Sequence, residues 1–145
     1  ARALARRVDF LSVGSNDLTQ YLLAVDRNNA RVAHLYHSFH PAVLQALAYV
    51  ATASQSEGVP IGICGELAGD PGGAVLLLAM GYDVLSMNAI SLPRVKKALR
   101  NLRRSEARSL LKEVMQLDCA LQVNARLEQF LTQHGMEKFI HSPVE

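Results

Sequence analysis

Short apolar runs alternate along the chain with longer segments in which apolar residues recur at helical spacing. Three runs, residues 8–14, 60–64 and 83–87, are short enough for strands. Between them, apolar residues after Pro41 recur three or four positions apart until Gly58, and a second helical segment spans about 71–80. The pattern predicts a strand, a helix, a strand, a helix and a third strand in that order.

Three further helices are predicted beyond the third strand. A basic helix covers about 93–104, with Ser91 as its expected cap and Pro93 in its first turn, and two more helices cover about 105–117 and 120–134. Asp70 is the expected cap of the 71–80 helix, and Gly81 and Gly135 mark helix ends. The chain begins in ARALARR, which has the character of the last turns of a helix.

Strands that alternate with helices predict a parallel sheet built from βαβ units, so the predicted fold class is α/β. The strands have few polar positions, which is typical of strands buried on both faces. Three strands alone leave two unpaired edges and cannot close a barrel. We therefore expect a fragment of a larger α/β domain that lacks its N-terminal strands, with the helices after Arg104 covering the last unit.

Composition and charge narrow the class of protein. The chain has 145 residues, half of them apolar, and a net charge of +2, which suits one domain with a real core. No apolar run approaches the roughly 20 residues of a membrane span, and no signal peptide is evident. Cys64 and Cys119 lie far apart without metal-ligand spacing, so we expect reduced thiols and a cytoplasmic protein that does not bind membranes.

Two clusters have an ordinary interpretation and a functional one. The basic residues between Arg94 and Arg104 alternate with apolar residues at helical spacing, which favours a solvated helix face; nucleic-acid binding would need interleaved aromatics, which are absent. His34, His37 and His40 lack an accompanying acidic pattern, which favours surface or capping roles over a metal site. We therefore expect no nucleic-acid partner.

Polar residues follow each predicted strand, at the edge where parallel α/β proteins place their sites. Asn16 and Asp17 follow the first strand. Asp17 is a hard oxygen ligand suited to Mg²⁺, whereas the alternative is that both residues cap a short helix through Tyr21 and Leu22. Arg27 is suited to clamp a phosphate or carboxylate, or else to form a surface ion pair with Asp26 or another acid.

Cys64 follows the second strand, between Gly62 and Gly65. A free cysteine is usually a small buried hydrophobe. At the end of a strand and before a helix, however, backbone amides and the helix dipole can tune a thiol for chemistry. Both interpretations of Cys64 stay open on the sequence alone.

Three stretches resemble a known family: SVGSNDLTQYLLAVDRNN, GICGELAGD and LSMNAISLPRVKKALR. Together they are similar, in order and spacing over most of residues 8–104, to the C-terminal barrel of the phosphoenolpyruvate-protein phosphotransferases, the enzyme I family of the phosphotransferase system within the wider phosphoenolpyruvate-utilising enzymes. Residues 21–29, 40–44 and 127–136 are most similar to the nitrogen-related paralogue.

The resemblance implies a TIM-type (β/α)₈ barrel. Residues 1–104 would supply about the last three βα units of that barrel, and residues 105–145 would form a C-terminal helical extension of the same domain. The resemblance also implies that Asp17 is a Mg²⁺ ligand, Asn16 and Arg27 bind phosphoenolpyruvate, and Cys64 is the acid that protonates the pyruvate enolate. The phosphoryl group would pass through a histidine on another domain to a histidine-containing phosphocarrier protein, and the parent protein would be a homodimer.

The family's second metal carboxylate, its other phosphate-binding arginines and its accepting histidine match nothing in this chain. We therefore expect this chain alone to be inactive. Two alternatives are a dimerisation or regulatory module without catalysis, and the barrel of a sibling phosphoenolpyruvate synthase or pyruvate phosphate dikinase.

Overall fold

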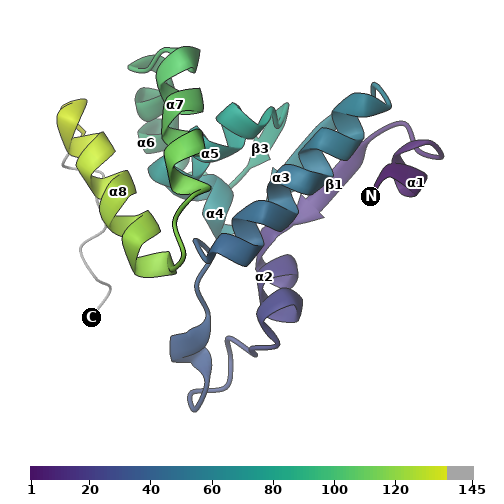
Figure 1. The fold of residues 1–145 in the computed structure, drawn as a ribbon, viewed down its shortest axis with the longest axis horizontal. Helices are drawn as coiled ribbons and strands as arrows, with labels where there is room; N and C mark the ends of the chain where they lie inside the picture. The colour runs from purple at the N-terminus through teal and green to yellow at the C-terminus, as the bar shows by residue number, and fades with distance from the viewer. Residues whose placement is uncertain (137–145) are drawn as a thin grey trace.

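The computed structural model describes residues 1–136, and its elements follow the predicted order (Figure 1). They are α1 (Arg2–Ala5), β1 (Leu11–Gly14), α2 (Ser15–Leu23), the 3₁₀ turn η1 (Ala33–Leu35), α3 (Pro41–Ser56), β2 (Ile61–Cys64), α4 (Glu66–Gly69), α5 (Pro71–Met80), β3 (Val84–Ser86), α6 (Leu92–Arg100), α7 (Arg104–Val114) and α8 (Ala120–Gln133). Helices α1 and α8 lie at opposite ends of the molecule (Figure 1). No helix of the described part is long and apolar enough to span a membrane.

The three strands form one parallel sheet in the order β1-β2-β3. Gly14 pairs with Cys64, and Cys64 pairs with Ser86, so the carboxyl ends of all three strands are level. Helix α3 connects β1 to β2, and α5 connects β2 to β3. The predicted α/β class and the parallel pairing are confirmed.

Within residues 1–136, helices cover one face of the sheet. Ile61 and Ile63 on β2 are 1% exposed and pack in one apolar cluster with buried residues of α3, α5, α7 and α8. The alternate positions Cys64, Val84 and Ser86 are exposed. Burial on both faces is therefore not found in this part of the chain, because only one layer of helices lies against the strands.

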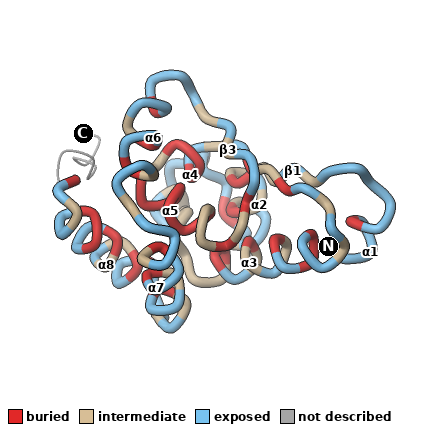
Figure 2. The backbone as a smooth tube through the Cα atoms, turned by 90° about the horizontal axis from the view of Figure 1, so that it is seen from above, coloured by how far each residue is buried: buried red, intermediate tan, exposed pale blue. Residues whose placement is uncertain are grey.

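Helix α5 lies at the centre of the core, and Figure 2 shows it almost entirely in the colour of buried residues. Its predicted cap is confirmed, since Asp70 Oδ1 accepts a hydrogen bond from the Gly73 N–H at 2.8 Å. Its end at Gly81 is confirmed as well, with a left-handed φ of 92°.

The expected cap of the basic helix is wrong in its chemistry. Ser91 occupies the N-cap position of α6, but its side chain makes no capping hydrogen bond, because its backbone is already helical at φ −76°, ψ −27°. A capping side chain reaches the next N–H groups from an extended backbone. Instead, Asn88 Oδ1 accepts the Ser91 N–H at 2.8 Å.

Several element boundaries differ from the prediction: the first strand starts later, the third strand is shorter, and the basic helix and α7 both end earlier than expected. The first strand begins at Leu11 and not at residue 8; its ladder starts where the Leu11 N–H meets the Pro60 carbonyl, and Pro60 has no N–H of its own to extend the pairing. The basic helix ends at Arg100, and α7 begins after Arg103, whose N–H donates to Glu106 at 2.7 Å.

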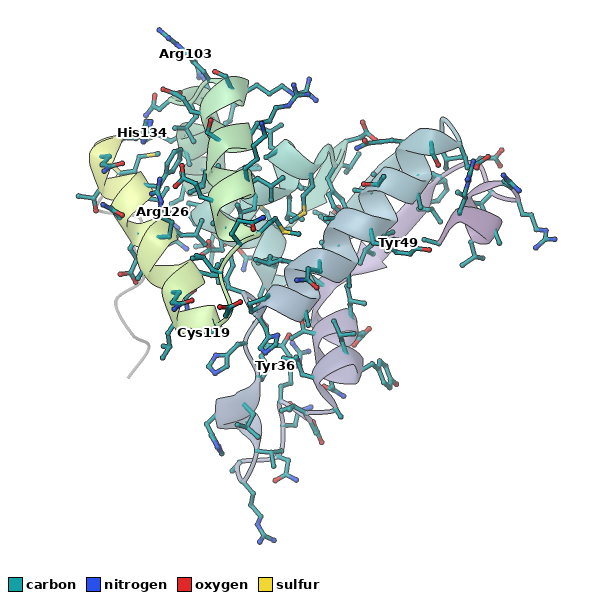
Figure 3. All side chains as sticks on the ribbon, in the orientation of Figure 1. Tyr36, Tyr49, Arg103, Cys119, Arg126 and His134 are labelled. Atoms are coloured by element: carbon teal, nitrogen blue, oxygen red, sulfur yellow. The ribbon has the colours of Figure 1, made fainter. Side chains whose placement is uncertain are left out.

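Ion pairs fasten the outer helices. Glu57, just after α3, accepts hydrogen bonds from Arg2 and Arg6, and these bonds lower the pKa of its carboxyl group. At the other end of the molecule, the Nε of Arg126 on α8 lies 2.7 Å from Oε2 of Glu113 on α7. Figure 3 shows Arg126 on the side of α8 that faces α7. Besides this ion pair, buried apolar residues of α7 and α8 pack in the same hydrophobic core as the sheet.

Candidate active site

A pocket of about 700 Å³ opens at the carboxyl ends of the strands. We call it the strand-end pocket. It is lined by Asn16, Cys64, Gly65, Glu66, Gly69, Asp70, Ser86, Met87, Asn88, Ser91 and Arg94. The three polar strand ends therefore meet at one edge, as predicted, and two of the four predicted site residues, Asn16 and Cys64, line the pocket itself.

Asn16 is held in one orientation. Its Oδ1 accepts the Glu66 backbone N–H at 3.4 Å and lies 3.5 Å from the hydroxyl of Tyr36, which reaches Asn16 from the segment before α3 (Figure 3). Because the oxygen is used in this way, the amide NH₂ group is the part of Asn16 that is available to a ligand. That group is a hydrogen-bond donor, which suits an anionic oxygen.

Ser15 and Gly65 fix the junction between β2 and α2. Ser15, 1% exposed, donates from Oγ to the Cys64 carbonyl at 2.9 Å. Gly65 has φ +123°, and a Cβ there would lie 2.2 Å from Ser15 Oγ and 3.2 Å from Asn16 Oδ1. Only glycine permits both this backbone and this close approach. Sequence reasoning did not find Ser15, although its place between Gly14 and Asn16 put it at the strand end.

Cys64 is exposed and lines the strand-end pocket, so it is not a buried hydrophobe. It ends β2 on the face opposite Ile63, which is buried. Alternation along the strand thus turns the thiol toward the open side of the sheet. Its carbonyl is fixed by Ser15, which holds the residue in place.

Asp17 and Asn16 do not cap α2. Gly14 holds the cap position and no side chain makes a capping hydrogen bond, so that alternative is wrong. Asp17 is exposed in the first helical turn, and its Oδ2 lies 3.5 Å from where a Cβ of Gly14 would be. The carboxylate therefore turns back over the end of β1.

Arg27 forms an ion pair across the site. Its Nη1 lies 3.3 Å from Glu66 Oε1, so the acid it meets is a pocket residue and not its neighbour Asp26. The side chains of Arg27 and Glu66 are 39% and 73% exposed, and ion pairs that are open to water contribute little to stability. The pair nevertheless keeps the guanidinium at the edge of the strand-end pocket.

Arg94 lines the strand-end pocket, whereas Lys96, Lys97 and Arg100 on the same helix are exposed. The prediction of a solvated basic face therefore holds for those three and fails for Arg94. Its position in the first turn of the helix that follows a polar strand end was the available signal.

The histidine prediction is confirmed at His40, whose Nδ1 accepts the Ala42 N–H at 3.2 Å and so caps α3. Across residues 1–136, no group of three or more histidine, cysteine, aspartate or glutamate side chains is placed to hold a metal ion. His141 lies outside the described residues.

Residues 1–104 match the family model described as the PEP-binding domain of PEP-utilising enzymes. The chain is 47% identical over 136 residues to a phosphoenolpyruvate-protein phosphotransferase of Haemophilus influenzae, covering 94% of this chain and 24% of that protein. It is 47% identical over 133 residues to an Escherichia coli protein named phosphoenolpyruvate-dependent phosphotransferase system, covering 92% of this chain and 18% of that protein. Multiphosphoryl transfer protein 2 of Escherichia coli is 47% identical over 123 residues, 85% of this chain and 15% of that protein. The chain thus spans a quarter or less of these relatives.

Proposed function

Because the chain belongs to the PEP-utilising enzyme family, we propose that it forms the C-terminal part of the phosphoenolpyruvate site of a phosphoenolpyruvate-protein phosphotransferase. The observation that carries this proposal is the strand-end pocket, where Asn16 and Cys64 meet and the Arg27–Glu66 pair lies at the edge. The enzyme would move the phosphoryl group of phosphoenolpyruvate to a histidine on another domain, pass it to a histidine-containing phosphocarrier protein and release pyruvate.

Asn16 and Arg27 would bind the phosphoenolpyruvate. The amide NH₂ of Asn16 donates to an anionic oxygen, since its Oδ1 is already used by the Glu66 N–H. Arg27 offers a planar fork of N–H donors that fits two oxygens of a phosphate. Charge neutralisation of this kind is the main protein contribution to phosphoryl transfer.

Cys64 would be the general acid. Once the phosphoryl group has left, the enolate of pyruvate needs a proton on its terminal carbon; the Cys64 S–H bond breaks, a C–H bond forms and a thiolate remains. The exposed thiol beside Asn16, with its carbonyl fixed by Ser15, supports this role. A positioned proton donor typically contributes about 10²–10⁴-fold to the rate.

Asp17 would supply one carboxylate to Mg²⁺, which usually takes one or two carboxylates and leaves its other positions to water and substrate phosphate. The side chain is exposed and turned over the end of β1, which suits that ion. Bound there, Mg²⁺ would neutralise charge on the phosphoryl group.

The same proposal covers the architecture. Residues 1–104 would supply the last three βα units of a (β/α)₈ barrel, and residues 105–145 a helical extension. The uncovered face of the sheet and the single partners of β1 and β3 within residues 1–136 support additional strands. We place the enzyme in the cytoplasm, as the two free thiols favour, and we expect a homodimer.

The test is pyruvate release by the intact phosphotransferase carrying this region. Cys64→Ala is expected to slow it by about 10²–10⁴-fold. Cys119→Ala is the matched control, because Cys119 is also an exposed free cysteine but does not line the strand-end pocket. Normal release by Cys64→Ala would instead support a dimerisation or regulatory module.

Residues 1–145 alone are expected to transfer no phosphoryl group. The family's other phosphate-binding arginines and its phosphoryl-accepting histidine have no counterpart among these residues. Incubation with ³²P-labelled phosphoenolpyruvate and a carrier protein tests this. Label on the chain or on the carrier would refute it.

A further inference from the structure

Arg94 carries a positive charge that no described residue neutralises. It lies in the first turn of α6 and lines the strand-end pocket. Its Nε is shielded from solvent and has no hydrogen-bond partner within residues 1–136. A guanidinium group keeps its charge at any physiological pH, and an unpaired N–H donor out of water is costly, so such a group favours an anionic partner.

The acids of the pocket are engaged elsewhere. Glu66 forms its ion pair with Arg27, and Asp70 Oδ1 accepts the Gly73 N–H. No ion pair joins Arg94 to any carboxylate of the described chain. The guanidinium of Arg94 is therefore available to pair with an anionic group of a ligand that enters the strand-end pocket.

The order of the strands places Arg94 opposite Asn16. Asn16 follows β1, Cys64 ends the central strand β2, and Arg94 lies on the helix that follows β3. A ligand whose reacting carbon lies at the Cys64 thiol would thus have the Asn16 amide on one side and the Arg94 guanidinium on the other. Phosphoenolpyruvate carries two anionic groups, a carboxylate and a phosphate, on the carbon next to the one that is protonated.

We propose that Arg94 is a further substrate-binding residue of this pocket and that its guanidinium binds an oxyanion, carboxylate or phosphate, of the bound phosphoenolpyruvate. The inference rests on the proposed function. It adds a cation on the β3 side of the site, where the sequence indicated only a solvated helix face.

Steady-state kinetics of the intact phosphotransferase test the proposal. Arg94→Gln is expected to raise KM for phosphoenolpyruvate by about 10- to 100-fold, the effect of losing one or two charged hydrogen bonds, with a smaller change in kcat. Arg94→Lys is expected to restore part of the loss, because it keeps the charge but not the fork. Arg100→Gln, the same change at an exposed position of α6, is the matched control and is expected to leave KM unchanged.

Inhibition by two fragments of the substrate identifies the oxyanion. If Arg94 binds the carboxylate, Arg94→Gln weakens inhibition by pyruvate and leaves inhibition by inorganic phosphate unchanged; if it binds the phosphate, the reverse holds. A KM within twofold of the unsubstituted enzyme overturns the inference, and a fall in melting temperature with that unchanged KM assigns Arg94 a structural role. An unsubstituted enzyme that does not consume phosphoenolpyruvate refutes the proposed function, and the inference falls with it.

Discussion

Replacing Gly65 by alanine perturbs the junction on which the site is built. Gly65 has φ +123° and ψ −172°, a region that is almost restricted to glycine. The added Cβ would lie 2.2 Å from Ser15 Oγ, closer than any real contact, and 3.2 Å from Asn16 Oδ1. Either the backbone of Gly65 or the start of α2 must therefore move.

The loss of folding stability expected for Gly65→Ala has two parts. Forcing a residue with a Cβ into this backbone region costs about 1–3 kcal/mol. Displacing the buried Ser15 hydroxyl from the Cys64 carbonyl adds about 0.5–1.5 kcal/mol. We expect Gly65→Ala to lower the free energy of unfolding by about 2–4 kcal/mol, a large part of the stability of an ordinary domain.

Urea denaturation followed by circular dichroism measures this change. Gly58→Ala is the matched control, because Gly58 also has a positive φ, +69°, but nothing lies within 4 Å of its added Cβ; it should cost roughly 1–2 kcal/mol. Ser15→Ala removes the clashing oxygen, so the double variant with Gly65→Ala should be less destabilised than the sum of the two single variants. Equal losses for Gly65→Ala and Gly58→Ala, or strict additivity with Ser15→Ala, would refute this reasoning.

Three further predictions concern the scaffold. Leu76→Ala should destabilise the chain by about 2–5 kcal/mol in the same urea assay, because Leu76 is 1% exposed in the core; a loss below about 1 kcal/mol would contradict that packing. Asp70→Ala should cost about 1 kcal/mol through the lost cap of α5, and Asp70→Asn should cost less because it keeps the acceptor; equal losses would argue against the cap. Hydrogen bonds from Arg2 and Arg6 lower the pKa of Glu57, so their stabilising effect is present above its ordinary pKa of 4.5 and is lost as the pH falls through the lowered value. The difference in urea midpoint between wild type and Glu57→Gln should therefore shrink between pH 6 and pH 3, and a constant difference would disprove the coupling.

The order of elements was predictable because local signals and packing agree. The apolar periodicity after Pro41 and the Asp70 and Gly81 signals identified α3 and α5, where every terminus has a local chemical cause. The meeting of the polar strand ends was predictable for a different reason. A parallel sheet brings the carboxyl ends of its strands to one edge whatever the side chains are. Cys64 and Asn16 thus line one pocket, as the sequence indicated.

Long-range contacts were not predictable from local pattern. The Arg27–Glu66 pair joins residues 39 positions apart, and the Asn16–Glu66 hydrogen bond joins residues 50 apart. The serine at the start of α6 failed as a cap because Asn88 had already ordered the preceding turn. The prediction that Arg94 belongs to a solvated face was wrong, because helical spacing shows which face of a helix is polar but not whether that face lines a pocket.

The level strand ends also decide which atoms of β2 can do chemistry at all. Side chains alternate along a strand, so sliding β2 by one residue against β1 would exchange its two faces. Ile63 would then project into the pocket, and the Cys64 thiol would be buried against the helices. Insertion or deletion of a single residue in β2 would therefore remove the thiol from the pocket and put the isoleucine side chain in its place. The length of this four-residue strand is thus as much a part of the chemistry as the cysteine itself.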